Sequence, residues 1–136
     1  MMNLLRFSFL PKSADLGLLV LRLHLGLSML LLHGWGKVLN FSAAAPGFQS
    51  PIPQLPSQVA YGLMVFAEAG CSILLVLGLL TRFASLTLLI NMTVAFVVAH
   101  KMQWKGDNPG ELAFLYLGGY LVLFIAGAGR FSIDRK

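Results

Sequence analysis

The chain has 136 residues, of which 57% are hydrophobic and 11% are charged, and its formal net charge is +5. Soluble domains carry about 25% charged residues, so this composition excludes a water-soluble fold, and the lack of any run of basic residues excludes nucleic acid as a partner. A bilayer-spanning helix needs ~20 largely apolar residues, and the chain contains four such segments, at about 16–39, 58–80, 83–100 and 111–129. We therefore expect an all-α integral membrane protein, an antiparallel up-down four-helix bundle in a single domain (1–136).

The first predicted helix follows a short basic tail and begins near Asp15, which we expect to cap it. A secretory signal is the alternative, because small residues at 42–45 follow the apolar stretch. However, the stretch is too long for the apolar region of a signal, and it contains Arg22, His33 and Lys37. We therefore predict an uncleaved first helix.

The segment 40–57 contains four prolines and no charged residue. Proline interrupts a helix because its ring removes a backbone donor and clashes with the preceding turn. We expect an extended apolar loop at the membrane interface, which serves either as a plain connector or as a lid or docking surface.

The second and third helices are separated only by Thr81 and Arg82. So short a connection predicts an antiparallel helical hairpin. The only cysteine, Cys71, lies inside the second helix, so an intrachain disulfide is excluded and we interpret Cys71 as an apolar filler.

A polar loop at 101–110 follows the third helix. Trp104 in this loop has the placement of an interfacial anchor. The fourth helix is expected to begin at Glu111 and to end in the glycine-rich stretch 127–130, before a short basic tail.

Basic residues are divided unevenly between the two sides of the predicted bundle. One side carries Arg6, Lys12, Arg82, Arg130, Arg135 and Lys136, and the other carries at most Lys37, Lys101 and Lys105. Because cytoplasmic loops are enriched in Lys and Arg, we expect both termini to be cytoplasmic.

Several ionisable residues lie within the predicted first helix, where they are costly and are usually paired inside a bundle. At about 100° per residue, Arg22, Gly26, His33 and Lys37 form one stripe along this helix. His24 points away from the stripe, and we interpret it as a locally bonded histidine.

On the second helix, Tyr61, Glu68 and Ser72 fall within about 40° of one another. Glu68 lies near the middle of the bilayer and needs a partner. At about 1.5 Å per residue, Arg22 and Glu68 differ in depth by ~8 Å, which a guanidinium side chain spans. We therefore predict an Arg22–Glu68 ion pair, with Asn91 of the third helix closing the network.

A second polar cluster is expected toward the outer face, where ordinary interfacial polarity explains the residues equally well. Its members are His33, Lys37, His100, Glu111, Trp35 and Trp104. Asn91 and His100 lie about 180° apart around one helix, so both face the bundle centre only if the helix ends before His100.

Three sequence features follow one another in order over nearly the whole chain. They are Arg22, Gly26, His33-Gly34-Trp35-Gly36-Lys37 and Phe41; Glu68 followed by Leu77-Gly78-Leu79-Leu80-Thr81-Arg82; and the ending Gly127-Ala128-Gly129-Arg130-Phe131-Ser132-Ile133-Asp134. In this order and spacing the chain resembles the DoxX family, although Ala128 stands where many relatives are expected to have proline. The resemblance implies a small, multi-pass bacterial or archaeal inner-membrane protein associated with quinone-linked oxidoreductases or with membrane complexes that handle thiol or oxidative stress.

The resemblance and the buried polar groups together predict a membrane subunit of a quinone-dependent oxidoreductase. Quinone reduction needs an apolar slot and a proton donor near each carbonyl. The candidate catalytic residues are Glu68, His33 and Lys37, and the candidate ligand-binding residues are Arg22, Tyr61, Asn91 and Trp35. The sequence has no flavin or nicotinamide motif and no expected metal site, so a soluble or membrane partner subunit is expected to supply any redox group other than the quinone.

Other functions stay open. A non-catalytic membrane anchor or assembly subunit would use the Arg22–Glu68 pair only to fix helix register. A haem b protein would use His33 and His100 as its two ligands, although the facing of His100 disfavours it. Transport of a small molecule would require the chain to form a homo-oligomer, because a single chain offers only four helices.

Overall fold

The computed structural model describes residues 2–134. Every regular element in this part of the chain is a helix, which confirms the all-α prediction for these residues. In chain order the elements are α1 (Met2–Leu5), α2 (Ala14–Met29), η1 (Leu30–Gly34), α3 (Trp35–Leu39), α4 (Phe41–Ala44), η2 (Ala45–Gly47), α5 (Ser57–Val65), η3 (Phe66–Cys71), α6 (Ser72–Leu77), α7 (Thr81–Val94), η4 (Ala95–Ala99) and α8 (Glu111–Ala126).

Consecutive elements join into four helical rods. The first rod is Ala14–Leu39, the second is Ser57–Leu77, the third is Thr81–Ala99 and the fourth is α8 alone. The first three rods are long and apolar enough to cross a membrane, whereas α8 is apolar but has only 16 residues. Of the four predicted spans, three therefore reach the expected length.

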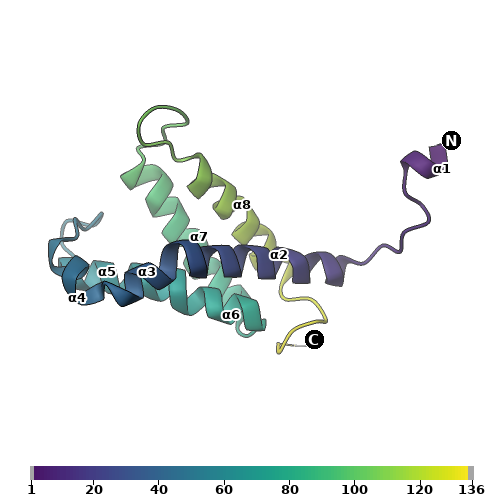
Figure 1. Cartoon of the computed structure of the whole chain (residues 1–136), viewed down its shortest axis with the longest axis horizontal. Coiled ribbons are helices and arrows are strands. Elements are labelled where there is room, and N and C mark those ends of the chain that lie inside the picture. Colours follow the sequence, from purple (N-terminus) through teal and green to yellow (C-terminus); the bar gives the residue numbers. More distant parts are fainter. Residues whose placement is uncertain (1, 135–136) are drawn as a thin grey trace.

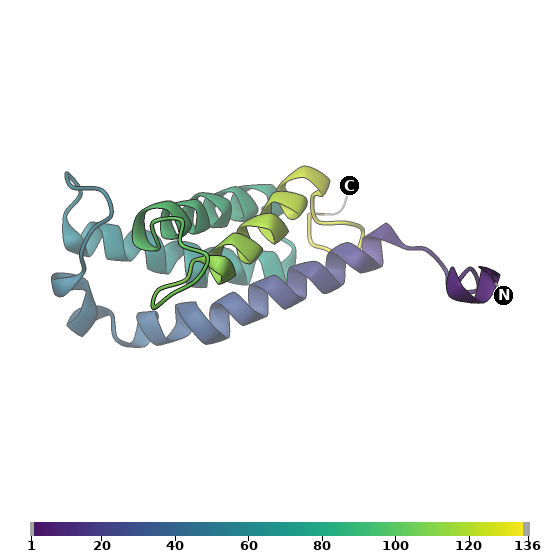
Figure 2. The ribbon, with the colours of Figure 1, turned by 90° about the horizontal axis from the view of Figure 1, so that it is seen from above.

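The first and second rods run antiparallel, and α7 and α8 form an antiparallel pair that crosses them (Figures 1 and 2). We call the end of the molecule where α2 and α7 begin and α6 and α8 end the terminal end, and the opposite one the loop end. The tail that carries α1 extends away from the rods (Figure 1). Fully buried leucines from three rods, Leu75, Leu88 and Leu123, fill the core between them.

Two arginines at the terminal end bind backbone carbonyls at and just beyond the end of α8. The four acceptors are the carbonyl oxygens of Phe124, Ile125, Ala128 and Phe131. Arg82 binds the first two at 3.0 Å, and Arg22 binds the last two at 2.7 Å. The last carbonyls of a helix have no partner within it, and a cation favours the negative end of the helix dipole, so both guanidinium groups stabilise this end.

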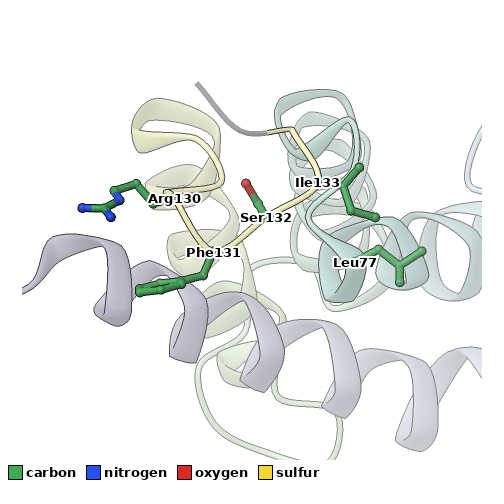
Figure 3. Close-up of a pocket in the computed structure, with 5 residues that line it drawn as sticks. All are labelled: Leu77, Arg130, Phe131, Ser132 and Ile133. Atoms are coloured by element: carbon green, nitrogen blue, oxygen red, sulfur yellow. The ribbon is translucent and has the colours of Figure 1, made fainter.

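Beyond α8 the chain turns back toward α6. Gly127 and Gly129 have positive φ angles of 82° and 74°, which glycine adopts without steric cost, and this is why α8 ends at Ala126 and not at residue 129. The returning residues 130–133 and Leu77 line a surface pocket of about 520 Å³. Ile133 and Leu77 lie on one side of the pocket in Figure 3, and Arg130 and Phe131 extend toward α2 on the other.

Asp134 caps the beginning of α7. Its carboxylate accepts hydrogen bonds from the backbone N–H groups of Leu80 and Thr81, both at 2.8 Å. Burial alone raises the pKa of this carboxyl group, but the two N–H donors and the charge of Arg22 outweigh that effect. The pKa of Asp134 is therefore lowered from its ordinary value.

The prediction that Asp15 caps the first helix is wrong. The Ser13 hydroxyl accepts a hydrogen bond from the backbone N–H of Leu16 at 3.2 Å and forms the cap. Asp15 lies inside the first turn, and its carboxylate accepts from the backbone N–H of Arg130 at 3.0 Å. Sequence alone left the two residues indistinguishable, because both are good cap residues.

We predict that Asp134→Asn lowers the free energy of unfolding by about 1 kcal/mol at neutral pH, because the amide has one acceptor oxygen in place of two and no charge at the beginning of the helix. A carboxyl group whose pKa is lowered by folding stabilises the protein above its unfolded pKa, and this stabilisation is lost as the pH falls through the folded value. The difference in free energy of unfolding between wild type and Asp134→Asn should therefore be largest at pH 7 and should vanish below about pH 3.

Thermal unfolding in detergent between these pH values measures the gap. Asp107→Asn, in the exposed loop after the third rod, is the matched control and should unfold like wild type throughout. A gap for Asp134→Asn that persists in acid would contradict the role of the carboxylate.

Candidate intramembrane site

Glu68 lies buried in the second rod, and side chains from two other rods bind its carboxylate. Lys37 Nζ forms an ion pair with Glu68 Oε2, and Asn91 Nδ2 donates a hydrogen bond to Oε1 at 3.3 Å. The Glu68 side chain is 6% exposed and that of Lys37 is 31% exposed. These three residues, which we call the Glu68 site, connect three rods where an unpaired carboxylate would be costly.

The Glu68 site lies where two π-helical turns, η1 and η3, pack against each other. A methyl group on Gly34 of η1 would lie 2.6 Å from the carbonyl oxygen of Glu68 in η3. Only glycine therefore lets the two backbones approach this closely. Single π-helical turns are rare and are often found at functional sites, and here one occurs on each side of the contact.

The predicted Arg22–Glu68 ion pair is wrong. Arg22 is level with Gly78, because a methyl group on Gly78 would lie 2.8 Å from Arg22 Cζ. The prediction measured the depth of each residue from the cytoplasmic end of its own helix and assumed that these ends are level. In the structure, α2 begins about 12 Å beyond the level at which α6 ends. Gly34 is the residue level with Glu68, and this register brings Lys37 to the carboxylate.

Aromatic side chains lie on the loop-end side of the Glu68 site. The ring centroid of Tyr61 is 5.4 Å from that of Phe41 and 5.3 Å from that of Phe48, both in edge-to-face geometry. Phe41 follows Lys37 by four residues, and Tyr61 precedes Glu68 by seven. Tyr61 therefore lies about two helical turns from Glu68 along the second rod, and Phe41, in α4 just after the first rod, contacts it at the loop end.

Comparison with protein families matches the chain to one model. The model is DoxX, and the match covers residues 17–101, which include the whole Glu68 site. The chain belongs to the DoxX family. The family prediction from the sequence motifs is therefore confirmed.

Similar proteins are found in other bacteria. An uncharacterised protein of Haemophilus influenzae is 35% identical over 79% of this DoxX protein and 81% of its own length. The inner membrane proteins YqjF and YphA of Escherichia coli are 30% and 28% identical, over 93% and 99% of the chain and over 95% and 100% of their own lengths. No solved structure matches. With its long apolar rods, this DoxX protein is a multi-pass protein of the bacterial inner membrane.

The residues of the predicted first-helix stripe do not line one site in this DoxX protein. The His33 ring meets the Tyr116 ring edge-on, with centroids 5.9 Å apart. Arg22 binds carbonyls at the terminal end, and Lys37 binds Glu68. A turn with i→i+5 bonds separates Arg22 from Lys37, so the constant angle per residue assumed for the stripe does not hold across it.

His100 takes part in the loop end and not in the Glu68 site. The third rod ends at Ala99, and His100 Nδ1 lies 3.3 Å from the carbonyl oxygen of Asn108. The helix thus ends before His100, which frees His100 from the register of Asn91, but His100 contacts the loop and not the bundle centre.

The other members of the predicted outer cluster have separate surroundings. Trp104 packs against Phe96 and Phe114, with ring centroids 5.1 Å and 4.9 Å away. Trp35 is 52% exposed, and Glu111 is exposed at the beginning of α8. These contacts are typical of an aromatic belt at a membrane interface.

The sequence analysis missed an interior pair of tyrosines on α8. The Tyr116 hydroxyl donates a hydrogen bond to Ser28 Oγ at 2.8 Å, and its ring stacks on that of Tyr120 at 5.9 Å. Tyr120 is fully buried. Their spacing of four residues, which puts both on one helix face, was the available signal.

We predict that Gly34→Ala lowers the free energy of unfolding by about 2 kcal/mol, the scale of overpacking a tight core, because its methyl group would meet the Glu68 backbone. Gly36→Ala is the matched control, since nothing lies within 4 Å of a methyl group there. That substitution should be neutral or stabilising, because alanine favours a helix over glycine. Thermal unfolding in detergent compares the two, and equal stabilities would contradict the close contact.

Proposed function

We propose that this protein is a membrane subunit that binds a quinone beside the Glu68 site and supplies protons to it. Lys37 and Glu68 would be the proton donors and Tyr61 the aromatic neighbour of the quinone ring. The observation that carries the proposal is an intramembrane ion pair that is closed on one side and open on the other.

The unequal exposure of the two charges supports access by a lipid-soluble molecule. Glu68 is almost fully covered, whereas nearly a third of the Lys37 side chain is exposed. A polar group at this depth faces lipid and not bulk water. A quinone dissolved in the bilayer could therefore reach the ammonium group without entering from either aqueous side.

The neighbouring rings support a flat aromatic ligand. Tyr61 is 5% exposed, because two phenylalanines contact its ring edge-on and form a layer of aromatic rings with it. Aromatic rings favour edge-to-face and offset-stacked neighbours. A quinone ring packed along this layer would have one carbonyl directed toward Lys37 and Glu68.

The reaction needs components that this chain lacks. Reduction of a quinone adds two electrons and two protons and yields the quinol. Lys37 would give one proton to a carbonyl oxygen. Glu68, which is a carboxylate in the ion pair, would take up a proton from water and give it to the other carbonyl oxygen, and Lys37 would then be reprotonated from water. The electrons would come from a redox group of a partner subunit, in agreement with the absence of a flavin or nicotinamide motif in the sequence.

We propose that the terminal end faces the cytoplasm and that α8 is the fourth spanning segment. Arg6, Lys12, Arg82 and Arg130 belong to the terminal end, and Lys101 and Lys105 to the loop end. The excess of basic residues at the terminal end favours its cytoplasmic placement. Arg135 and Lys136, which the sequence-based orientation also used, lie outside the described residues.

We predict that Glu68→Gln and Lys37→Gln weaken the binding of decylubiquinone about 10-fold to 100-fold. Loss of a hydrogen bond to a charged group costs about 1.5–3 kcal/mol, which corresponds to this range of affinities. Quenching of tryptophan fluorescence in nanodiscs measures the affinity, and extraction of co-purified quinone provides a second readout. Glu111→Gln and Lys105→Gln remove the same charges from exposed positions and should bind like wild type.

A charge swap separates binding from folding. The double variant Lys37→Glu/Glu68→Lys keeps opposite charges at the two positions, so it should restore thermal stability relative to the single variants. It moves the carboxyl group to the exposed position, so quinone affinity should stay reduced. Equal quinone binding by wild type and all variants would refute the proposal, and a haem absorption band in the purified protein would favour the haem alternative.

The second candidate function is a non-catalytic anchor or assembly subunit. The hydrogen bonds of Arg22, Arg82 and Asp134 favour it, because these charged side chains bind backbone groups at helix ends and so stabilise the fold. In that case, variants of the Glu68 site would lower the folding yield while the turnover of the assembled partner stayed unchanged.

A further inference from the structure

The interior of the bundle contains buried polar side-chain atoms that have no hydrogen-bond partner among the described residues. They include Arg22 Nε, Ser72 Oγ, Ser85 Oγ and the hydroxyl of Tyr120. All four side chains are 0–1% exposed. Most buried polar groups in proteins are paired with protein or with ordered water, so several such groups in one small interior need an explanation.

These groups lie between the terminal end and Glu68. Close contacts of three glycines show which residues of the first two rods are level. A methyl group on Gly78 would meet Arg22 at 2.8 Å, and one on Gly26 would lie 3.1 Å from the Ser72 carbonyl oxygen. A methyl group on Gly34 would meet the backbone of Glu68. Ser72 therefore lies at a level between Arg22 and Glu68.

The other two rods contribute hydroxyl groups at the same levels. Ser85 lies about 6 Å from the beginning of α7, and Tyr120 about 9 Å from the end of α8. The Tyr120 ring stacks on that of Tyr116, whose hydroxyl binds Ser28 of the first rod, so Tyr120 faces the interior between the rods. Polar groups from three rods thus occupy the levels between the terminal end and Glu68.

We propose that these groups hold a column of buried water that carries protons from the terminal end to the Glu68 carboxylate. A buried water molecule typically makes about three hydrogen bonds to otherwise unpaired groups, and the serine and tyrosine hydroxyls can both donate and accept. A proton would enter from bulk water, pass along the hydrogen bonds and convert the carboxylate of Glu68 to the carboxylic acid.

The surface pocket at residues 130–133 and Leu77 is the entry to this column. Phe131, whose carbonyl oxygen binds Arg22, and Ser132, whose Cβ would lie 2.5 Å from a methyl group on Gly78, both line it. The pocket therefore shares Phe131 with the hydrogen bonds of the Arg22 guanidinium. The positive charge of Arg22 would repel a proton on its own, but Asp134 brings a carboxylate to the same turn and interacts with that charge.

Two side chains bind Glu68, since Lys37 and Asn91 each contact one of its two oxygens. The contact between the rings of Phe41 and Tyr61 lies toward the loop end, on the other side of Glu68 from the proposed column. The column rests on the proposed function in that it supplies the protons which quinone reduction at the same site consumes.

The test follows the protonation of Glu68 itself, without quinone or partner. After a rapid drop in pH, infrared spectroscopy of the protein in nanodiscs records the rise of the carboxylic acid band, which Glu68→Gln assigns. In Ser72→Val/Ser85→Val, where methyl groups replace the hydroxyls, protonation should slow at least tenfold. Thr93→Val removes a hydroxyl from the exposed face of α7 and should leave the rate as in wild type.

The near-isosteric Ser72→Ala/Ser85→Ala variant protects the test against a folding defect. Its protonation should also be slower than in wild type, by a smaller factor, because alanine leaves room for water but removes its hydrogen bonds. An unchanged rate in this variant, accompanied by a higher unfolding temperature, is the behaviour of hydroxyls that hold no water and would overturn the proposal. If the wild-type protein does not bind quinone but Glu68 is protonated at the expected rate, the proposed function is contradicted and the proposed water column is not.

Discussion

The contact between Gly34 and the backbone of Glu68 fixes how the first two rods lie against each other. Two helices normally stay 8–10 Å apart, and a glycine allows a closer approach. Once this contact is made, Lys37 is placed opposite the carboxylate and Arg22 is placed beyond the end of α6. The ion pair inside the membrane and the arginine contacts at the terminal end are both consequences of this one register.

The charged residues of the two regions serve different purposes. At the terminal end, Arg22 and Arg82 each donate two hydrogen bonds to fixed carbonyl oxygens, and Asp134 accepts two from backbone N–H groups. Such bonds leave little capacity for another ligand. At Glu68 the partners are an amine on a long side chain and an amide from other rods, and the amine is partly exposed. This second group is therefore the one to which the proposed chemistry is assigned.

The sequence predicted the number of apolar segments, the tight hairpin and the family, because hydropathy and motif spacing are local properties. The connection of the hairpin is residues 78–80, however, and Thr81 and Arg82, which were predicted to form it, begin α7. It also singled out Glu68, Lys37 and Asn91 as polar residues at unusual depth. It assigned the partner of Glu68 wrongly, because depth counted from helix ends assumes that the rods begin at a common level and that every turn has the same width. The overhang of α2 and the π-helical turn before Lys37 break both assumptions, and both depend on packing between rods.

The shortness of α8 has a consequence for the surrounding lipid. Its 16 residues span about 24 Å, some 6 Å less than the hydrocarbon core of a typical bilayer. A helix that ends below the surface would normally leave its last carbonyls unpaired in hydrocarbon, but here the guanidinium groups of Arg22 and Arg82 already bind carbonyls at and just beyond its last turn. The proposed fourth spanning segment can therefore end below the membrane surface without unpaired carbonyls, and the bilayer need not become thinner on this side of the molecule.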